Sequence, residues 1–153
     1  PIVYQHFGGK EGLYAVIVDR AVNDLTERIM SGMVYGASRE SAEASAAAFL
    51  AFIEEEEESF RILLHDGPGS GTDGSLSLVI GEIADRTEEL LATQFKDLGY
   101  DRGTAPMYAR MLVGATALVG EWWLEVRTPP REEVARHIVN LMWNGLKNLE
   151  RQP

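Results

Sequence analysis

The chain lacks cysteine altogether, contains only three lysines that lie far apart, and has no long apolar run. Without cysteine it has no disulfide framework, no thiol nucleophile and no zinc–thiolate site, which suits a reducing compartment. Its densest apolar stretch, residues 111–123, is shorter than the roughly 18 residues of a membrane span and contains Glu121. We therefore expect a cytoplasmic protein that does not cross a membrane.

Acidic residues outnumber basic ones, with 24 Asp and Glu against 14 Lys and Arg and a formal net charge of −10. Binding to nucleic acid needs a basic face for the phosphates, so composition by itself argues against such binding. The 153 residues are 45% hydrophobic and 25% charged, which is ordinary for a globular domain. A chain of this length buries enough surface to fold without a disulfide or a metal. Composition thus predicts a soluble acidic domain but does not indicate its function.

Apolar residues recur at helical spacing almost throughout, and no segment keeps the alternation of a strand. Glycine and proline separate the periodic segments, and residues 65–74 hold four glycines and a proline, which is typical of a loop. We expect Ser41 to cap the second long helix. The pattern predicts an all-α bundle, without repeats or an interdomain linker, whose helices cover residues 10–33, 41–58, 75–98 and 105–126 and a last segment after residue 130.

Neither the acidic run nor the histidines form a recognisable catalytic or metal site. Residues 54–58 are five consecutive glutamates, and consecutive helical side chains point about 100° apart, so they cannot converge on one metal ion. We expect them to form a solvated face. His65 and His137 lack a neighbouring nucleophile or ligand cluster. The sequence therefore predicts no catalytic residue, no metal site and no cofactor.

The first 14 residues, PIVYQHFGGKEGLY, carry the most specific pattern in the chain. Val3, Tyr4 and Phe7 share one face of a short helix, Gly8 and Gly9 form a tight turn, and a long helix follows. This stretch resembles the end of the helix-turn-helix in the TetR family of transcriptional repressors. The positions that match the family pattern are Pro1, Val3, Tyr4, His6, Phe7, Lys10, Glu11 and Leu13.

The resemblance implies that residues 1–9 are the remnant of a recognition helix and that residues 10–150 are a helical domain for effector binding and dimerisation. By position, Tyr4 and His6 would contact phosphates, and Gln5 would reach a base edge or the backbone. Lys10 would grip a further phosphate. The family's first two helices are absent from this sequence. We therefore expect operator DNA to be a partner of the parent protein and not of this fragment.

In the family, the last two long helices pair with those of a second copy in a four-helix interface. The resemblance implies such a homodimer here, with close backbone approach at Gly114, Ala117 and Gly120. A second apolar stripe would be completed by Leu124, Val139, Trp143 and Leu146. The alternative is that these residues only pack the core of one chain.

The resemblance also implies a cavity between the middle helices for a small, largely apolar effector. Candidate lining residues are the large apolar side chains of successive helices together with possible polar groups: Phe49, Phe52, Phe60, Thr87, Tyr108, Met111, Trp122 and Trp123. The implied function is a ligand-responsive repressor. Its effector would shift the helix over residues 10–33 and so change the spacing between the two DNA-binding heads of the dimer. The dimer would then release the operator.

Two other classes of protein remain open at this point. A small helical-bundle enzyme or cofactor carrier would show a bound metal or chromophore after purification. A structural acidic dimerisation module would have a solid core with no cavity. Neither alternative explains the residues YQHFGGKEGL near the N-terminus.

Overall fold

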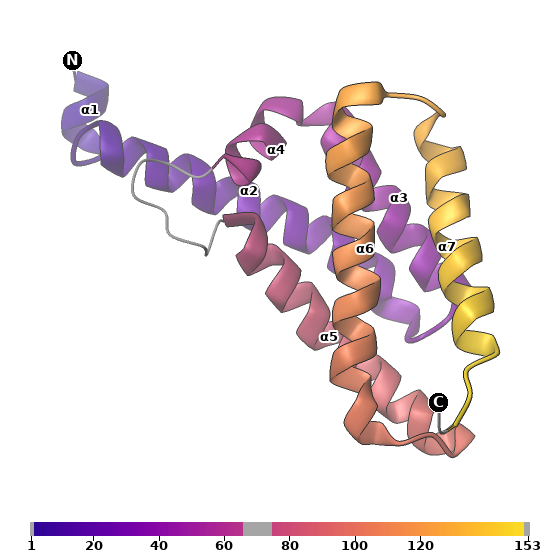
Figure 1. Cartoon of the computed structure of the whole chain (residues 1–153). Coiled ribbons are helices and arrows are strands. Elements are labelled where there is room, and N and C mark those ends of the chain that lie inside the picture. The colour runs from indigo at the N-terminus through magenta and orange to yellow at the C-terminus, as the bar shows by residue number, and fades with distance from the viewer. Residues whose placement is uncertain (1, 66–74, 152–153) are drawn as a thin grey trace.

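The computed structural model describes residues 2–65 and 75–151, and this part of the chain contains helices and turns but no strand. The predicted all-α class is therefore confirmed. Figure 1 shows the elements, which in chain order are α1 (Ile2–His6), α2 (Lys10–Gly32), the short 3-10 helix η1 (Met33–Tyr35), α3 (Arg39–Glu55), α4 (Glu57–Leu64), α5 (Ser75–Leu98), the 3-10 helix η2 (Arg102–Thr104), α6 (Ala105–Val126) and α7 (Arg131–Lys147).

Helix α2 runs from the bundle out to α1 (Figure 1). Its buried residues all lie in its C-terminal half. Ala21, Leu25 and Ile29 recur every fourth residue and are buried, which is one face of a helix. Val16 and Ile17, nearer α1, are 48% and 41% exposed. At the other end Gly32 permits a close approach, because an added Cβ would lie 2.6 Å from the backbone nitrogen of Ser45 on α3.

Two predicted boundaries are wrong. Helix α3 is capped by Ser38 and not by Ser41, since the Ser38 hydroxyl oxygen accepts a hydrogen bond from the Ser41 amide at 3.1 Å. The helix expected over residues 41–58 is two helices, because the backbone leaves helical geometry at Glu56 (φ −123°, ψ 45°). After this break, Phe60 lies on α4 and is buried in the core. The loop expected over residues 65–74 lies, after His65, outside the described residues.

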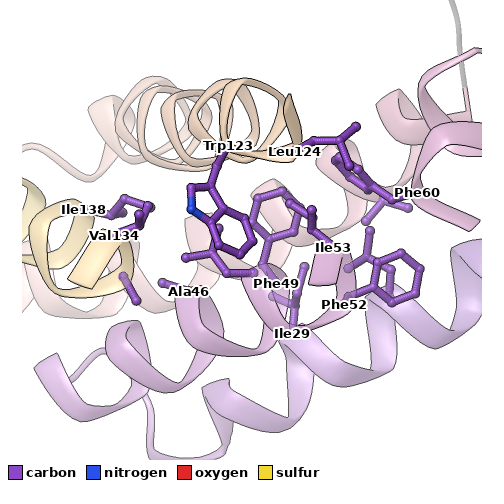
Figure 2. Close-up of a cluster of buried hydrophobic side chains, with 14 of the residues drawn as sticks. Ile29, Ala46, Phe49, Phe52, Ile53, Phe60, Trp123, Leu124, Val134 and Ile138 are labelled. Atoms are coloured by element: carbon purple, nitrogen blue, oxygen red, sulfur yellow. The ribbon is translucent and has the colours of Figure 1, made fainter. Parts of the chain in front are cut away.

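The main core lies where α3, α4, α6 and α7 meet, with α2 beneath them (Figure 2). Phe49 and Phe60 contact each other edge to face, with ring centroids 5.8 Å apart. Trp123 is 1% exposed, and its indole nitrogen donates to the carbonyl oxygen of Pro129 at 2.7 Å. That hydrogen bond satisfies the one polar atom of the buried indole and fixes the turn between α6 and α7 to the core.

A second, smaller cluster lies at the far end of α5 and the start of α6. It joins Leu91 and Phe95 of α5 to Ala105 and Ala109 of α6. Tyr100 packs on Phe95 and donates its hydroxyl to the carbonyl oxygen of Leu149 at 3.3 Å. Helix α5 packs mainly on α6, and α7 packs mainly on α3. None of the described helices combines the length and the apolar composition that a membrane-spanning helix needs.

Candidate functional site

The N-terminal motif forms a short helix, a glycine turn and the start of α2. Gly8 and Gly9 have φ values of 75° and 99°, which residues with a side chain rarely adopt. The carbonyl of Phe7 then folds back so closely on Gly12 that no side chain fits there. The sequence analysis missed Gly12, whose place in a regular helix gives no local signal. These three glycines fix the direction of α1 relative to α2.

The residues expected to contact DNA lie on this N-terminal unit. The side chains of Gln5, His6 and Lys10 are exposed, and the imidazole of His6 packs edge to face on Phe7 at 5.1 Å. Tyr4 lies on α1, but its side chain falls outside the described part of the structure. The exposed polar groups are thus available to a partner.

A cavity of about 180 Å³ lies between the two clusters, bounded by α3, α5, α6 and α7 and by the turn after α2. Its walls are mostly aliphatic, and none of the described residues that line it is charged. A partly open, uncharged and mainly apolar cavity is suited to an uncharged apolar ligand, since a charged one would lose hydration without gaining a counter-ion.

Most polar side chains of the cavity wall hydrogen-bond to the protein itself. Thr87 donates to the carbonyl oxygen of Ile83 at 2.8 Å, and Thr116 donates to that of Leu112 at 2.8 Å. Ser45 donates to the carbonyl oxygen of Ile29 at 3.2 Å and so ties α3 to α2. These groups stabilise helices rather than present free donors.

The structure brings two of the eight expected effector residues, Phe49 and Thr87, to the cavity. Met111 and Trp122 are 54% and 52% exposed on the outer face of α6. The remaining four belong to the two packed clusters: Phe52, Phe60, Trp123 and Tyr108.

The sequence analysis missed the residues that make the cavity possible. The small side chains Ser41, Ala42, Ser45 and Ala46 leave room on α3, and long aliphatic side chains on α5 face them. The run SAEASAAA was the available signal, because its small residues recur on one helical face.

Most of the residues expected at a dimer interface pack against other residues of the same chain or line its cavity. The ring of Phe49 fills the space beside Gly120. An added Cβ at Gly120 would clash with that ring and lie 2.8 Å from Cδ1 of Ile53. Gly114 has open space beside it. Leu124 is buried in the core, and the other four line the cavity: Ala117, Val139, Trp143 and Leu146.

A different set of apolar side chains is exposed on the last two long helices. Helix α6 presents five at helical spacing, and α7 presents Leu141, which is 76% exposed. The last of the five, Val126, is 41% exposed at the end of α6. We call the other four the α6 stripe: Met107, Met111, Leu118 and Trp122, which are between 47% and 68% exposed. Exposed apolar side chains that recur along one helix are candidates for an interaction surface.

The five glutamates near the end of α3 are partly exposed, as expected, but four of them also form ion pairs. Arg28 of α2 donates to Glu55 at 2.9 Å, and Arg131 of α7 lies 2.8 Å from Glu54. Arg61 and Arg127 both donate to Glu57. These pairs join α2, α4, the α6–α7 turn and α7 at the opposite end of α3 from its N-cap. No group of three or more potential metal ligands gathers anywhere in the described residues.

Comparison with known proteins agrees with this architecture. The family model described as the tetracyclin repressor-like C-terminal domain matches residues 38–145. The chain is also 24% identical over 151 residues to the HTH-type transcriptional activator FasR of Mycolicibacterium smegmatis, an alignment that covers 97% of this chain and 68% of FasR. The family match takes in most of the residues around the cavity, and the N-terminal motif over residues 1–14 lies outside it. The chain therefore belongs to the TetR family and is part of a transcription regulator, not an enzyme.

Proposed function

We propose that residues 10–150 form the effector-binding and dimerisation domain of a one-component repressor, and that residues 1–9 end its DNA-reading head. The parent protein binds operator DNA as a homodimer. A small, uncharged and largely apolar molecule enters the cavity and releases the operator. The DNA-contacting side chains of this part are Tyr4, Gln5, His6 and Lys10.

The observation that carries the proposal is the position of the cavity at the C-terminal end of α2. Met33, Ala37 and Ser38 line it, and they belong to the turn that connects α2 with α3. The other end of α2 carries the glycine turn and α1 (Figure 1). A molecule that pushes on this turn displaces α2 along its length, and α1 moves with it.

In a dimer, such a displacement changes the spacing of the two reading heads. Heads that read successive major grooves must be about one helical turn of DNA apart, so a change in spacing weakens binding. Coupling of this kind amounts to about 1–3 kcal/mol. The α6 stripe and Leu141 support the dimer, because two copies would bury these side chains against each other.

A cavity-filling variant tests the effector site. Ala42 lines the cavity from α3, and Ala42→Leu extends an aliphatic side chain into it. Ala44→Leu is the matched control, since Ala44 lies on the same helix but is exposed. The full-length protein first selects binding fragments from genomic DNA, and binding to them is then titrated with ethylbenzene.

We expect ethylbenzene to weaken DNA binding by the natural protein and by the Ala44→Leu variant, but not by the Ala42→Leu variant. DNA affinity without ethylbenzene should be equal in all three. A full response of the Ala42→Leu variant would place the effector site elsewhere. No response of the natural protein would contradict the proposed effector class.

Activation is the second candidate, and the name of the relative FasR favours it. The same release of DNA by an effector would then lower transcription instead of raising it. A reporter gene behind a selected genomic fragment separates the two. Deleting the regulator raises reporter output if it represses and lowers output if it activates.

A further inference from the structure

One end of the cavity differs from the rest because its polar atoms are not fully used. Gln94 of α5 donates from Nε2 to the carbonyl oxygen of Ala37 at 2.6 Å. A carbonyl oxygen only accepts hydrogen bonds, so Nε2 and not Oε1 of the amide must face Ala37. Oε1 is then the second polar atom of this side chain. Among the described residues, no group donates to that oxygen. Gln94 therefore has a spare acceptor at the cavity wall.

Two serines of the same cavity wall lie close in the sequence to Ala37, the residue that this amide binds. Ser38 follows Ala37 directly, and its hydroxyl oxygen is 3.1 Å from that of Ser41. The Ser38 oxygen also accepts from the Ser41 amide. Two hydroxyls that share one hydrogen bond use one of their two protons, whichever of them donates. The described residues offer no further acceptor to the pair, so one hydroxyl proton remains for a ligand.

The other polar side chains of the wall do not offer the same combination. The protons of Ser45, Thr87 and Thr116 are all directed to backbone carbonyls. The polar end formed by Ser38, Ser41 and Gln94 thus supplies one acceptor and one donor, and the rest of the wall is mainly aliphatic. A single hydroxyl group on a ligand matches this pair, because it can donate and accept at once.

We propose that the cavity recognises an uncharged apolar molecule with one hydroxyl group, and that Gln94 and the Ser38–Ser41 pair bind this hydroxyl. The inference rests on the proposed function and specifies its effector. An apolar cavity of about 150 Å³ in another protein holds benzene. The cavity here, at about 180 Å³, has room for a slightly larger ring such as an alkylphenol.

The recognised group lies at the turn that joins α2 to α3. A hydroxyl that donates to Oε1 of Gln94 binds the same amide whose Nε2 holds the Ala37 carbonyl. It would therefore add to the push that any ligand in the cavity exerts on this turn. Gln94 would be a specificity-determining residue placed at the turn that joins α2 to α3.

The test compares ligands that differ in one group. 4-Ethylphenol and ethylbenzene share a ring and an ethyl group, and 4-ethylbenzoate adds a charge. Their binding to the purified chain is measured by calorimetry. Tryptophan fluorescence is a second readout, because Trp143, one of the three tryptophans, lines the cavity. We expect 4-ethylphenol to bind about three- to tenfold more tightly than ethylbenzene, the gain of about one net hydrogen bond, and 4-ethylbenzoate not to bind.

Variants assign the preference to its residues. Gln94→Met keeps the length of the side chain without the amide, and should equalise the two affinities. Ser41→Ala keeps the helix cap at Ser38 and should reduce the preference. Thr87→Val is the matched control, because its hydroxyl already donates to the backbone, and should retain the full preference. Retained binding of ethylbenzene shows that each variant keeps the cavity intact.

The outcomes separate this inference from the proposed function. If both uncharged ligands bind the natural chain equally, the hydroxyl is not recognised and the inference is wrong, although the cavity still binds apolar ligands. If the preference survives in Gln94→Met or disappears in Thr87→Val, the hydroxyl is bound elsewhere. If neither uncharged ligand binds, the proposed effector cavity itself is refuted.

Discussion

Arg127 and Glu57 are 70 residues apart in the sequence, yet Nη2 of Arg127 donates to Oε2 of Glu57 at 2.6 Å. The same guanidinium donates to the carbonyl oxygens of Leu124 and Ile53, and it lies 5.1 Å from the ring centroid of Trp123. The backbone of Arg127 adopts the left-handed helical conformation, with a φ of 55°. One side chain therefore closes the end of α6 and ties it to the junction of α3 and α4.

Removing this side chain should destabilise the domain. We expect Arg127→Ala to lower the free energy of unfolding by about 2 kcal/mol, because charged hydrogen bonds and the contact with Trp123 are lost. Arg127→Gly should recover part of that loss, since glycine tolerates the positive φ. Urea unfolding measures both. Arg20→Ala is the control: Arg20 is exposed and unpaired among the described residues, so a comparable loss there would contradict a specific role for Arg127.

Glu57 should make stability sensitive to acid. The hydrogen bond from Arg61, and then the charges of Arg127 and Arg61, lower its pKa below the ordinary value of 4.5. A carboxyl whose pKa falls on folding stabilises the protein above its ordinary pKa, and this contribution disappears as the pH falls through the lowered value. The difference in unfolding free energy between the natural chain and Glu57→Gln should thus be constant above about pH 4.5 and shrink below it.

Glu58→Gln is the matched control for this titration. Glu58 is adjacent and exposed, and it has no ion pair in the part of the chain that the structure describes. Urea unfolding at several pH values between neutrality and about pH 3 covers the window. A difference for Glu57→Gln that grows in acid would reverse the sign and refute the assignment.

Gly120 should tolerate no side chain, although alanine normally favours a helix over glycine by about 0.5–1 kcal/mol. An added Cβ would collide with the ring of Phe49, which is held in place by Phe60. We expect Gly120→Ala to lower the melting temperature. Gly81→Ala, in α5 with open space beside it, should raise it slightly. Equal effects of the two substitutions would mean that α6 is not packed on α3 as described.

The α6 stripe should hold the proposed homodimer together. Leu118, 68% exposed on α6, and Leu78, 63% exposed on α5, are matched in type and exposure. We expect Leu118→Glu to raise the dimer dissociation constant at least about tenfold, because it would bury a charge between two copies, while Leu78→Glu leaves it unchanged. Sedimentation equilibrium measures both. A natural chain that is monomeric at high concentration would refute the dimer outright.

The sequence by itself determined where the helices lie and many of their boundaries. Apolar spacing of three and four residues predicted them, and Gly99 and the pair Pro129–Pro130 marked two of their ends, because local backbone geometry needs no distant partner. The break at Glu56 carried no such mark. Both flanking segments favour helix, and the break goes together with the complete burial of Phe60 in the core.

The sequence also identified the family, since the N-terminal motif depends only on residue types at fixed spacing. The cavity was different. Its wall combines small residues of α3, such as Ala42, with Gln94 and other residues of α5, α6 and α7. A space left by small side chains becomes a cavity only when facing helices hold it open, and the local sequence does not encode that separation.

Trp122 and Trp123 show most directly what the sequence determined and what only the tertiary structure decided. They are neighbours of the same type, and the sequence analysis gave both the same role. In the structure Trp123 is 1% exposed and Trp122 is 52% exposed. Helical geometry turns consecutive side chains about 100° apart, so at most one of them could face the core. Which one did so was decided by the tertiary structure, because only the packing of α6 against α3 and α5 selects the buried face.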